Sequence, residues 1–484
     1  MADGIKGEMV DVRDRTARPR RFVVVGGGIS GLVAAWRLTQ KHGPSAEVLV
    51  LESSPLVGGK LRVGNVGDVT VDLGAESVLA RRPEAVELFS ELGLDEDVVH
   101  PRAASASVLS RDKLYPLPPG TVMGVPVDRT RLSALAGILD LDEVARAGQE
   151  RTTEALRLTE DIDVASWVTF RMGRAVVDRL VEPLLGGVYA GNADRLSLQA
   201  TIPQLWQRAR AGRPLLEGTQ PPPSAPARPV FAGLRGGVGR LPLVLAEKLE
   251  EAGGEIRTGV TVRGLARTAN GWRLTTGPAN GPEYIEADGV VLAVPAAPAA
   301  RLLSAEVPQA AQKLAGIETA SVAVIAAAVP RAQLEGLTGT GLLIPPIEKR
   351  QIKAATFSSN KWRWVSDEKP EDNLIVRLSL GRAREESTLQ RDDADLTELA
   401  LAELRELIGR DVRPAETQVV RWGGALPQYE VGHLDRVHRI REAVAGVPGL
   451  AVCGAVFDGV GIPACIAAAA RAAHDLDVSL RVSA

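Results

Sequence analysis

The stretch from Arg21 to Glu52 constrains the fold more than any other part of the chain. It reads RFVVV, then GGGISG, then a helix-like run, and finally EVLVLE. A continuous apolar run such as Phe22–Val25 is typical of a buried parallel strand. The glycines at positions 26, 28 and 31 satisfy G-x-G-x-x-G between that strand and the predicted helix, which is the context of a dinucleotide-binding turn. A tight turn without a ligand is the alternative, and the strand–turn–helix–strand order favours the binding site.

The motif also predicts which groups hold the dinucleotide. Backbone N–H groups can approach a pyrophosphate at the positive end of the helix. The residues of this turn are Gly26, Gly28, Ile29, Ser30 and Gly31. Glu52 closes the next strand, 21 residues after Gly31, where a carboxylate accepts hydrogen bonds from ribose hydroxyls and repels the 2′-phosphate of NADP.

Two further glycine segments favour FAD over NAD. Gly58-Gly59-Lys60 follows Glu52 and supplies a second glycine pair for the same pyrophosphate. Near the end of the sequence, Gly454 and the segment Val460-Gly461-Ile462-Pro463 precede an alanine-rich helix, whose first turn accommodates proline. The N-terminus of such a helix, directed at the N1/O2 edge of a flavin, stabilises the reduced anionic form. We therefore expect FAD, held by both ends of the chain.

The composition excludes several classes of protein. The 484 residues are 45% hydrophobic with a formal net charge of −3, which indicates two or three folded domains and gives no support for a nucleic-acid partner. Two cysteines and five scattered histidines lack the spacing of a disulfide framework or a metal site, so we expect no metal. Because we find neither a secretory signal nor an apolar run near the ~20 residues of a membrane span, we expect a cytoplasmic protein.

The order of patterns predicts an α/β fold with a second, α+β unit. We expect a flexible N-terminal extension at 1–20, and a Rossmann-like FAD-binding domain built from 21–85, 230–300 and 435–484. We expect a substrate-binding domain from 86–115 and 301–434, and a helical insertion at 116–229. Alternating strands in the substrate-binding part predict an antiparallel sheet, interrupted by a helix at 393–408.

Several segments carry a resemblance to a known family. The run GGGISGL…LE…GGK resembles the start of the amine-oxidase superfamily of FAD enzymes. Four more segments are similar to motifs of the protoporphyrinogen/coproporphyrinogen oxidases: DLGAES with LARR (72–82), EPLLGGVYAGN (182–192), W-x-x-x-x-PQY-x-x-GH (422–433) and GVGIP (459–463). The resemblance runs in consistent order from about residue 21 to 478. It points to the coproporphyrinogen III oxidase branch of Gram-positive bacteria.

This resemblance implies an activity and a set of site residues. The activity is the FAD-dependent, six-electron oxidation of a tetrapyrrole, coproporphyrinogen III, to coproporphyrin III in haem biosynthesis, with dioxygen reduced to three hydrogen peroxides. A ferrochelatase is a chemically sensible recipient of the product. Further cofactor-binding residues are Gly59, Lys60, Gly74, Val262, Trp422, Gly454, Val460, Gly461 and Ile462; substrate-binding residues are Arg81, Arg82, Gly191, Asn192 and Trp362. No side-chain base is assigned, because hydride transfer to flavin N5 depends on positioning and a dry pocket.

Other functions stay open at this point. Protoporphyrinogen IX is the alternative substrate. It has two propionates where coproporphyrinogen III has four, so binding of coproporphyrinogen III requires a pocket wall with more positive charge. Candidates for that wall are Arg81, Arg82, Lys353, Lys361 and Arg363. An amine oxidase needs aromatic walls around the flavin, and a carotenoid desaturase would leave the PQY…GH segment unexplained. A flavin-fold protein that binds a partner without turnover is disfavoured by the intact glycines.

Some assignments have a structural interpretation as well. Trp422 and Trp362 can be core residues, and Arg81-Arg82 can be solvated surface. Ala464 and the triplet Gly74-Ala75-Glu76 depart from the family pattern, which bears on substrate orientation more than on the flavin. The moderately apolar stretch 116–141 corresponds to a lipid-attaching region of membrane-bound relatives, but its interspersed charges predict at most loose membrane association.

Overall fold

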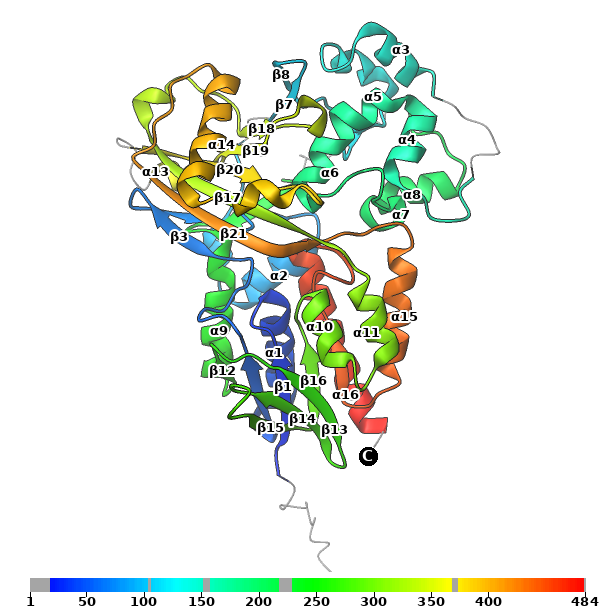
Figure 1. Ribbon diagram of the computed structural model, residues 1–484, viewed down its shortest axis with the longest axis vertical. Coiled ribbons are helices and arrows are strands. Elements are labelled where there is room, and N and C mark those ends of the chain that lie inside the picture. Colours follow the sequence, from blue (N-terminus) through cyan, green and yellow to red (C-terminus); the bar gives the residue numbers. More distant parts are fainter. Residues whose placement is uncertain (1–17, 103–105, 151–156, 217–228, 368–372, 483–484) are drawn as a thin grey trace, which may run out of the picture.

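The computed structural model describes residues 18–102, 106–150, 157–216, 229–367 and 373–482. Figure 1 shows two halves along the long axis, one around α1 and β1 and the other around a large sheet with helices beside it. Both ends of the described chain, near β1 and in α16, belong to the first half. Most of the predicted extension at 1–20 lies outside the described residues.

The first half is built on a five-stranded sheet in the order β12-β2-β1-β16-β22, with every strand pair parallel. Its strands are β1 (Arg20–Val25), β2 (Ala46–Leu51), β12 (Glu255–Arg257), β16 (Gly289–Leu292) and β22 (Leu450–Val452). The side chains of Phe22, Val23 and Val24 have no exposed surface. The predicted buried parallel strand and the Rossmann-like α/β fold are therefore confirmed.

Helices cover one face of this sheet, and a second layer covers the other. The first face packs against α1 (Ile29–His42), α2 (Pro83–Glu91), α9 (Leu241–Glu251) and α16 (Ile462–Val482). The second face packs against a small antiparallel sheet and three helices: β13 (Gly264–Thr268), β14 (Gly271–Thr276), β15 (Glu283–Ala287), α10 (Ala296–Leu303), α11 (Pro308–Ala315) and α15 (His433–Ala445).

The second half contains a seven-stranded sheet in the order β21-β17-β20-β19-β18-β7-β8. Its strands are β7 (Ser107–Ser110), β8 (Lys113–Pro116), β17 (Thr319–Pro330), β18 (Gly341–Leu343), β19 (Ile352–Phe357), β20 (Asn373–Leu380) and β21 (Glu416–Pro427). All neighbours are antiparallel except β18 and β7. Helix α14 (Asp393–Ile408) covers one face, at the bounds that the sequence predicted.

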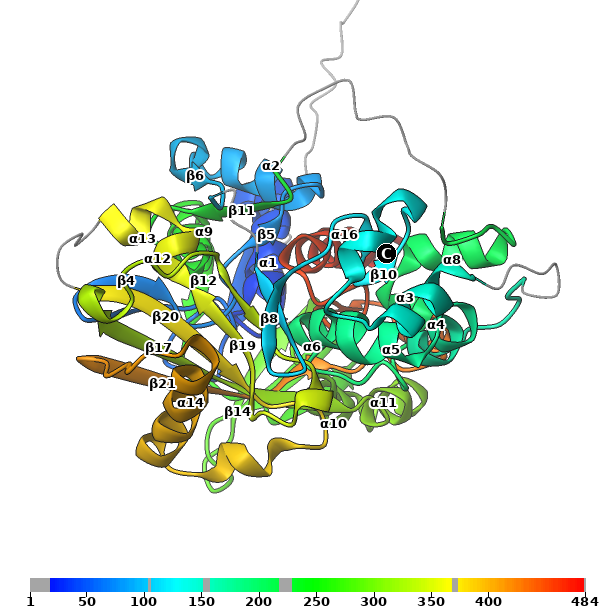
Figure 2. The ribbon, with the colours of Figure 1, turned by 90° about the horizontal axis from the view of Figure 1, so that it is seen from above.

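Helices gather beside this sheet, next to β18 and β19 (Figure 2). They are α3 (Leu141–Gly148), α4 (Val164–Met172), α5 (Arg174–Val176), α6 (Glu182–Tyr189), α7 (Leu198–Thr201) and α8 (Pro203–Arg210), with a π-helical turn, η5 (Val177–Val181), before α6. The described part of 116–229 also contains the short β9 (Thr121–Val122) and β10 (Val125–Pro126).

Short elements complete the fold. They are β3 (Val63–Val66), β4 (Val69–Asp72), β5 (Val78–Leu79), β6 (Val98–Val99), β11 (Phe231–Leu234), α12 (Ser358–Lys361), α13 (Arg363–Asp367) and the 3-10 helices η1 (Gly43–Ser45), η2 (Asp95–Asp97), η3 (Arg129–Leu135), η6 (Val238–Arg240), η7 (Arg331–Gln333), η8 (Pro346–Glu348) and η9 (Glu386–Gln390).

Two predicted domain boundaries need correction. Residues 301–318 were expected in the substrate-binding part, but α10 and α11 pack against the parallel sheet of the first half. Residues 86–99 were also expected there, yet α2 packs against the same sheet, and β6 pairs with β11 just ahead of α9. Both corrections have the same cause. The sequence pattern shows that these helices have an apolar face, but it does not show which sheet that face packs against.

Candidate functional site

The glycine turn between β1 and α1 is tightly folded at two positions and open at a third. A Cβ on Gly31 would lie 1.8 Å from the Gly26 carbonyl oxygen, and Gly26 itself has φ +108°, a conformation that L side chains rarely adopt. Gly28 is the N-cap of α1, and a Cβ there would meet no atom within 4 Å. The turn therefore leaves space beside the helix N-terminus, which is where a pyrophosphate would bind.

Glu52 lies directly beside this turn. Its Oε2 accepts the Gly27 N–H at 2.6 Å, and its Oε1 accepts the Ser54 N–H at 2.7 Å. The segment that leads to Val262 runs alongside, because the Val260 N–H donates to the Glu52 carbonyl at 2.8 Å. Val262, which the resemblance assigns to the cofactor, thus follows two residues after a backbone contact with Glu52.

The second glycine pair joins the same turn. The Gly58 N–H donates to the Gly27 carbonyl at 2.8 Å, and a Cβ on Gly59 would lie 3.4 Å from the Gly28 Cα. Lys60 follows; its side chain is exposed, yet the surrounding protein desolvates it and lowers its pKa. Its carbonyl oxygen would lie 1.9 Å from a Cβ on Gly74, so Gly74 is needed for close packing of the two segments.

The C-terminal glycine segment completes a cradle with two helix N-termini. Helix α16 begins at Ile462, directly after Gly461, and packs against α1. A Cβ on Gly454 would meet no atom within 4 Å, and one on Gly461 would meet only Pro463, at 3.8 Å. Neither helix carries an acidic residue in its first turn, so both positive ends are free to face an anion. This arrangement fits the pyrophosphate of a dinucleotide, with Val460 in the loop that leads to α16.

Trp422 lies where the two halves meet. Its indole Nε1–H donates to the Leu73 carbonyl at 3.0 Å, and its ring edge would lie 3.4 Å from a Cβ on Gly74. The residue is half-buried. The flavin contact predicted for Trp422 and Gly74 stays a prediction, but the two residues are adjacent and continue from Lys60.

A buried ionic network fixes the loop after Gly74. Glu76 accepts the Ser358 hydroxyl at 2.6 Å and pairs with Lys361 at 2.7 Å and with Arg377 at 3.3 Å. Burial by itself would raise the pKa of Glu76, but Lys361 and Arg377 outweigh it and lower the pKa to about 2. Arg377 also donates to the Gly74 carbonyl at 2.6 Å. Because Lys361 is neutralised by Glu76, it is a poor candidate for the cationic wall. The departure from the family pattern at Glu76 was the only signal for this network in the sequence.

The PQY…GH segment connects the cradle to the helices of the second half. The Tyr429 hydroxyl donates to the Ala455 carbonyl at 2.5 Å and accepts the Gly459 N–H at 2.8 Å. Its ring stacks on His433 at 3.9 Å between centroids, and burial lowers the pKa of His433 to about 4. Gln428 donates to the Tyr189 carbonyl at 2.8 Å. These residues hold the loop before α16 in place.

The predicted substrate-binding residues do not form one group. Arg82 caps α2 and pairs with Glu84 at 2.5 Å, with 44% of its side chain exposed, and Arg81 is exposed beside it. This surface ion pair favours the solvated interpretation of both arginines.

Gly191 and Asn192 follow α6 and differ in exposure. Gly191 is buried, and a Cβ there would lie 2.3 Å from Gln428 Oε1. Asn192 is exposed, and its side chain accepts the Asp194 N–H at 2.7 Å. Close packing therefore accounts for the glycine, and a turn accounts for the asparagine side chain. Their contact with substrate stays a prediction.

Trp362 is covered by protein. It is 1% exposed within an apolar cluster around Val66 and Ile375, and its ring would lie 2.9 Å from a Cβ on Gly233. Stacking on a tetrapyrrole would require this ring to leave its packing, so the structure favours a core role.

Neither a metal centre nor a membrane span is found in the part of the chain that the structure describes. No three His, Cys, Asp or Glu side chains among those residues form a group that could hold a metal ion. No helix there is both long and apolar enough to cross a membrane.

Relatives of this chain carry consistent descriptions. The protein described as coproporphyrinogen III oxidase of Mycobacterium leprae is 38% identical, over 95% of this chain and 99% of that protein. The protein of the same description from Bacillus subtilis is 32% identical, over 92% and 96%. Human protoporphyrinogen oxidase is 29% identical, over 94% and 98%.

Solved structures agree with the observed fold. A crystal structure from Exiguobacterium sp. 255-15, provisionally described as a protoporphyrinogen oxidase, has a TM-score of 0.83 and 31% identity, over 96% of this chain and 99% of that chain. Putrescine oxidase has a TM-score of 0.66 at 16% identity, over 95% and 99%, and shows the fold alone. The family model described as flavin containing amine oxidoreductase matches residues 29–477. The chain therefore belongs to the flavin-containing amine oxidoreductase family, as an FAD-dependent oxidoreductase of the α/β fold that its glycine motifs predicted.

Proposed function

We propose that this protein oxidises coproporphyrinogen III to coproporphyrin III, with dioxygen as the final electron acceptor. The observation that carries the proposal is the near-complete coverage of both chains by relatives described as coproporphyrinogen III oxidases. The cofactor half, the seven-stranded sheet and the adjoining helices thus all have counterparts in those proteins. The geometry is compatible with this function, because the dinucleotide cradle lies beside the seven-stranded sheet, and the face of this sheet opposite α14 is partly uncovered.

The uncovered face lies on two strands with neighbours on both sides. On β19 and β20, Ile352, Ala355, Leu378 and Leu380 are buried under α14. On the opposite face, Ala354, Thr356 and Ser379 are only half-buried although they sit in the middle of the sheet. We call these three residues the open face. Small side chains there leave room for a flat macrocycle.

Helix α6 borders the same space. It packs beside β18 and β19, and a Cβ on Gly186 or Gly187 would meet no atom within 4 Å. Two glycines in a helix each cost about 1 kcal/mol relative to alanine, and no neighbouring protein atom requires them here. A ligand that needs close approach to the helix would explain them.

The roles of the residues follow from this arrangement. The α1 turn, Gly59 and the loop before α16 would hold the pyrophosphate, and Gly74 and Trp422 would contact the flavin. Bound FAD supplies a hydride acceptor whose electrons are passed on to dioxygen. In total six hydrogens leave the macrocycle, and three dioxygen molecules become three hydrogen peroxides. The chain's task is to orient the macrocycle and exclude water, which requires no side-chain base.

Localisation and the next step belong to the same proposal. We propose that the enzyme works in the cytoplasm and that a ferrochelatase receives the porphyrin. The proposed recipient follows from the chemistry of haem formation, since a metal must enter the oxidised macrocycle.

Porphyrin fluorescence tests the function. The holoenzyme is mixed in air with coproporphyrinogen III or protoporphyrinogen IX; both are non-fluorescent until fully oxidised. We expect faster porphyrin formation from coproporphyrinogen III, with three hydrogen peroxides per porphyrin. A preference for protoporphyrinogen IX would favour the second candidate, which the human relative supports. Turnover of neither substrate would refute both.

A further inference from the structure

A buried lysine without an acidic partner lies next to the open face. Lys353 on β19 is only 6% exposed. Among the described residues, no carboxylate lies within ion-pair distance of its ammonium group, and no side-chain or backbone oxygen accepts a hydrogen bond from it. Buried lysines are rare unless they are paired, because desolvating an ammonium group is costly. The residue therefore calls for a functional explanation.

Lys353 lies between Ile352, which packs in the cluster with α14, and Ala354, which belongs to the open face. Register shifts by one residue between Ile352 and Ala354, so Lys353 is the extra residue of a β-bulge, a feature that often re-aims a side chain. On the α14 side, Glu403 accepts the Gln351 and Ile352 N–H groups at 2.9 Å each. Yet Glu403 is not among the groups that shift the pKa of Lys353. Burial, together with the positive charge of Arg382, lowers that pKa to about 7.

Within the described ranges, Arg382 is a second cation without an ion pair. Its guanidinium donates to the backbone carbonyls of Arg350 at 2.9 Å and Ile344 at 3.1 Å. The next residue, Ala383, donates its N–H to the Ala190 carbonyl at 2.7 Å, which places this corner at the C-terminal end of α6. Lys353 and Arg382 thus form a cationic corner between the open face and the segment that contains Gly191 and Asn192.

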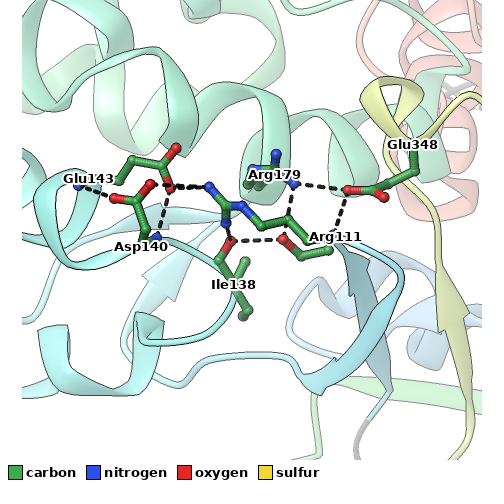
Figure 3. A network of polar contacts seen from close by, with 7 residues as sticks. Arg111, Ile138, Asp140, Glu143, Arg179 and Glu348 are labelled. Atoms are coloured by element: carbon green, nitrogen blue, oxygen red, sulfur yellow. Dashed lines mark hydrogen bonds and ion pairs between the residues drawn. The ribbon is translucent and has the colours of Figure 1, made fainter.

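The acids around this corner are already engaged. Glu348 pairs with Arg179 at 2.8 Å and accepts the Arg111 N–H at 2.9 Å, within the network of Figure 3. Glu182 accepts the Ala193 N–H at 2.8 Å, and burial raises its pKa to about 7. The charges of Glu385, Glu403 and Glu182 act to raise the pKa of Arg382, but burial outweighs them and lowers it. None of these acids forms an ion pair with Arg382 or Lys353 in the described part of the chain. An anionic ligand would supply the missing charge.

We propose that Lys353, with Arg382 behind it, binds a propionate carboxylate of the tetrapyrrole substrate. The inference rests on the proposed function and deepens it by naming a substrate-binding subsite. The macrocycle would lie along the open face, with one propionate at the cationic corner. Charge-assisted hydrogen bonds to a carboxylate are among the stronger polar contacts in proteins, and a rigid β-bulge presents the lysine with little loss of entropy.

Binding of the fluorescent product tests the subsite without turnover. The Kd of coproporphyrin III is measured with the holoenzyme by fluorescence titration, for the wild type and for Lys353→Met, Lys353→Arg and the surface control Lys248→Met. The coproporphyrin tetramethyl ester, which has no carboxylates, is titrated in the same detergent buffer. Flavin content and thermal unfolding are recorded for every variant.

We expect Lys353→Met to weaken coproporphyrin III binding roughly 10- to 100-fold. Binding of the ester should change less than threefold, and Lys353→Arg should recover most of the affinity. Thermal stability should be equal or higher, because removing an unpaired buried charge relieves desolvation. Lys248→Met, which changes an exposed lysine on α9, should match the wild type.

The outcomes separate this subsite from the proposed function. An unchanged Kd for coproporphyrin III in Lys353→Met, with the wild type still oxidising coproporphyrinogen III, overturns the subsite alone. Equal losses for acid and ester also overturn it, because they indicate a role in shape. If wild type oxidises neither porphyrinogen, the function fails; a carboxylate-specific loss in Lys353→Met then still supports the anion site.

Discussion

Glu76→Gln is expected to cost this protein about 3 kcal/mol of stability. The carboxylate is buried, accepts a hydroxyl from Ser358, and pairs with both Lys361 and Arg377. Glutamine keeps the shape but leaves two buried cations without an acid, a change that typically costs 3–5 kcal/mol. The pKa shift of Glu76 gives a second value for the same stability contribution. A carboxyl whose pKa falls from 4.5 to about 2 on folding contributes about 3 kcal/mol at neutral pH.

The pH dependence of this effect has a definite sign. Because folding lowers the pKa of Glu76, the ionised carboxylate stabilises the native state at any pH above about 4.5, and that stability is lost as the pH falls through about 2. The stability difference between wild type and Glu76→Gln should thus be constant from pH 8 to about 5. It should shrink at lower pH for as long as the protein stays folded.

Thermal unfolding of the holoenzyme, followed by the release of flavin fluorescence, measures the effect. Glu398→Gln is the matched control, because this glutamate forms a surface ion pair with Arg405 and is 68% exposed. Exposed pairs contribute about 0–1 kcal/mol. If Glu76→Gln lowers the unfolding temperature no more than Glu398→Gln does, the network does not stabilise the loop after Gly74 and the reasoning fails.

Three further predictions use the same assays. Gly31→Ala should lose most of its bound flavin, because the new Cβ would lie 1.8 Å from the Gly26 carbonyl oxygen. The control Gly316→Ala should retain its flavin, because a Cβ there would have its nearest atom at 3.7 Å. Equal flavin content in the two variants would count against the tight turn. Trp362→Phe should cost about 1–3 kcal/mol with an unchanged KM, and a several-fold rise in KM at full flavin content would restore the stacking role. In the wild type, burial of His433 lowers its pKa to about 4, so the free energy of unfolding should fall by about 3 kcal/mol as the pH drops from 6.5 to 4. His433→Phe should remove this fall, and an unaltered pH profile would show that His433 is not the group that titrates.

The local pattern of apolar residues predicted the strands and helices that bury one or both of their faces. The run at Phe22–Val25 indicated a parallel strand, and the helix at 393–408 was predicted at its observed bounds, since its apolar residues recur at helical spacing and pack against a sheet. The glycine motifs predicted the cradle for a similar reason. Gly26 and Gly31 sit where backbone atoms approach closely, whereas Gly28 and Gly454 leave open space beside a helix N-terminus. Both kinds of glycine position belong to short motifs that are visible in the sequence.

Charge pairing is set by contacts between segments far apart in the chain, so the charged positions were not predictable in the same way. Five cations were candidates for the polar wall, and only their partners distinguish them. Arg82 pairs two residues away and Lys361 pairs with Glu76, 285 residues away. Among the residues that the structure describes, Lys353 has no carboxylate within ion-pair distance, and Glu403 on the helix packed against its strand binds backbone N–H groups. Whether a lysine is neutralised inside the protein or left for a ligand thus depends on which neighbour captures the nearby carboxylate. In this chain, the carboxylate of Glu403 is held by two backbone N–H groups of the strand that carries Lys353.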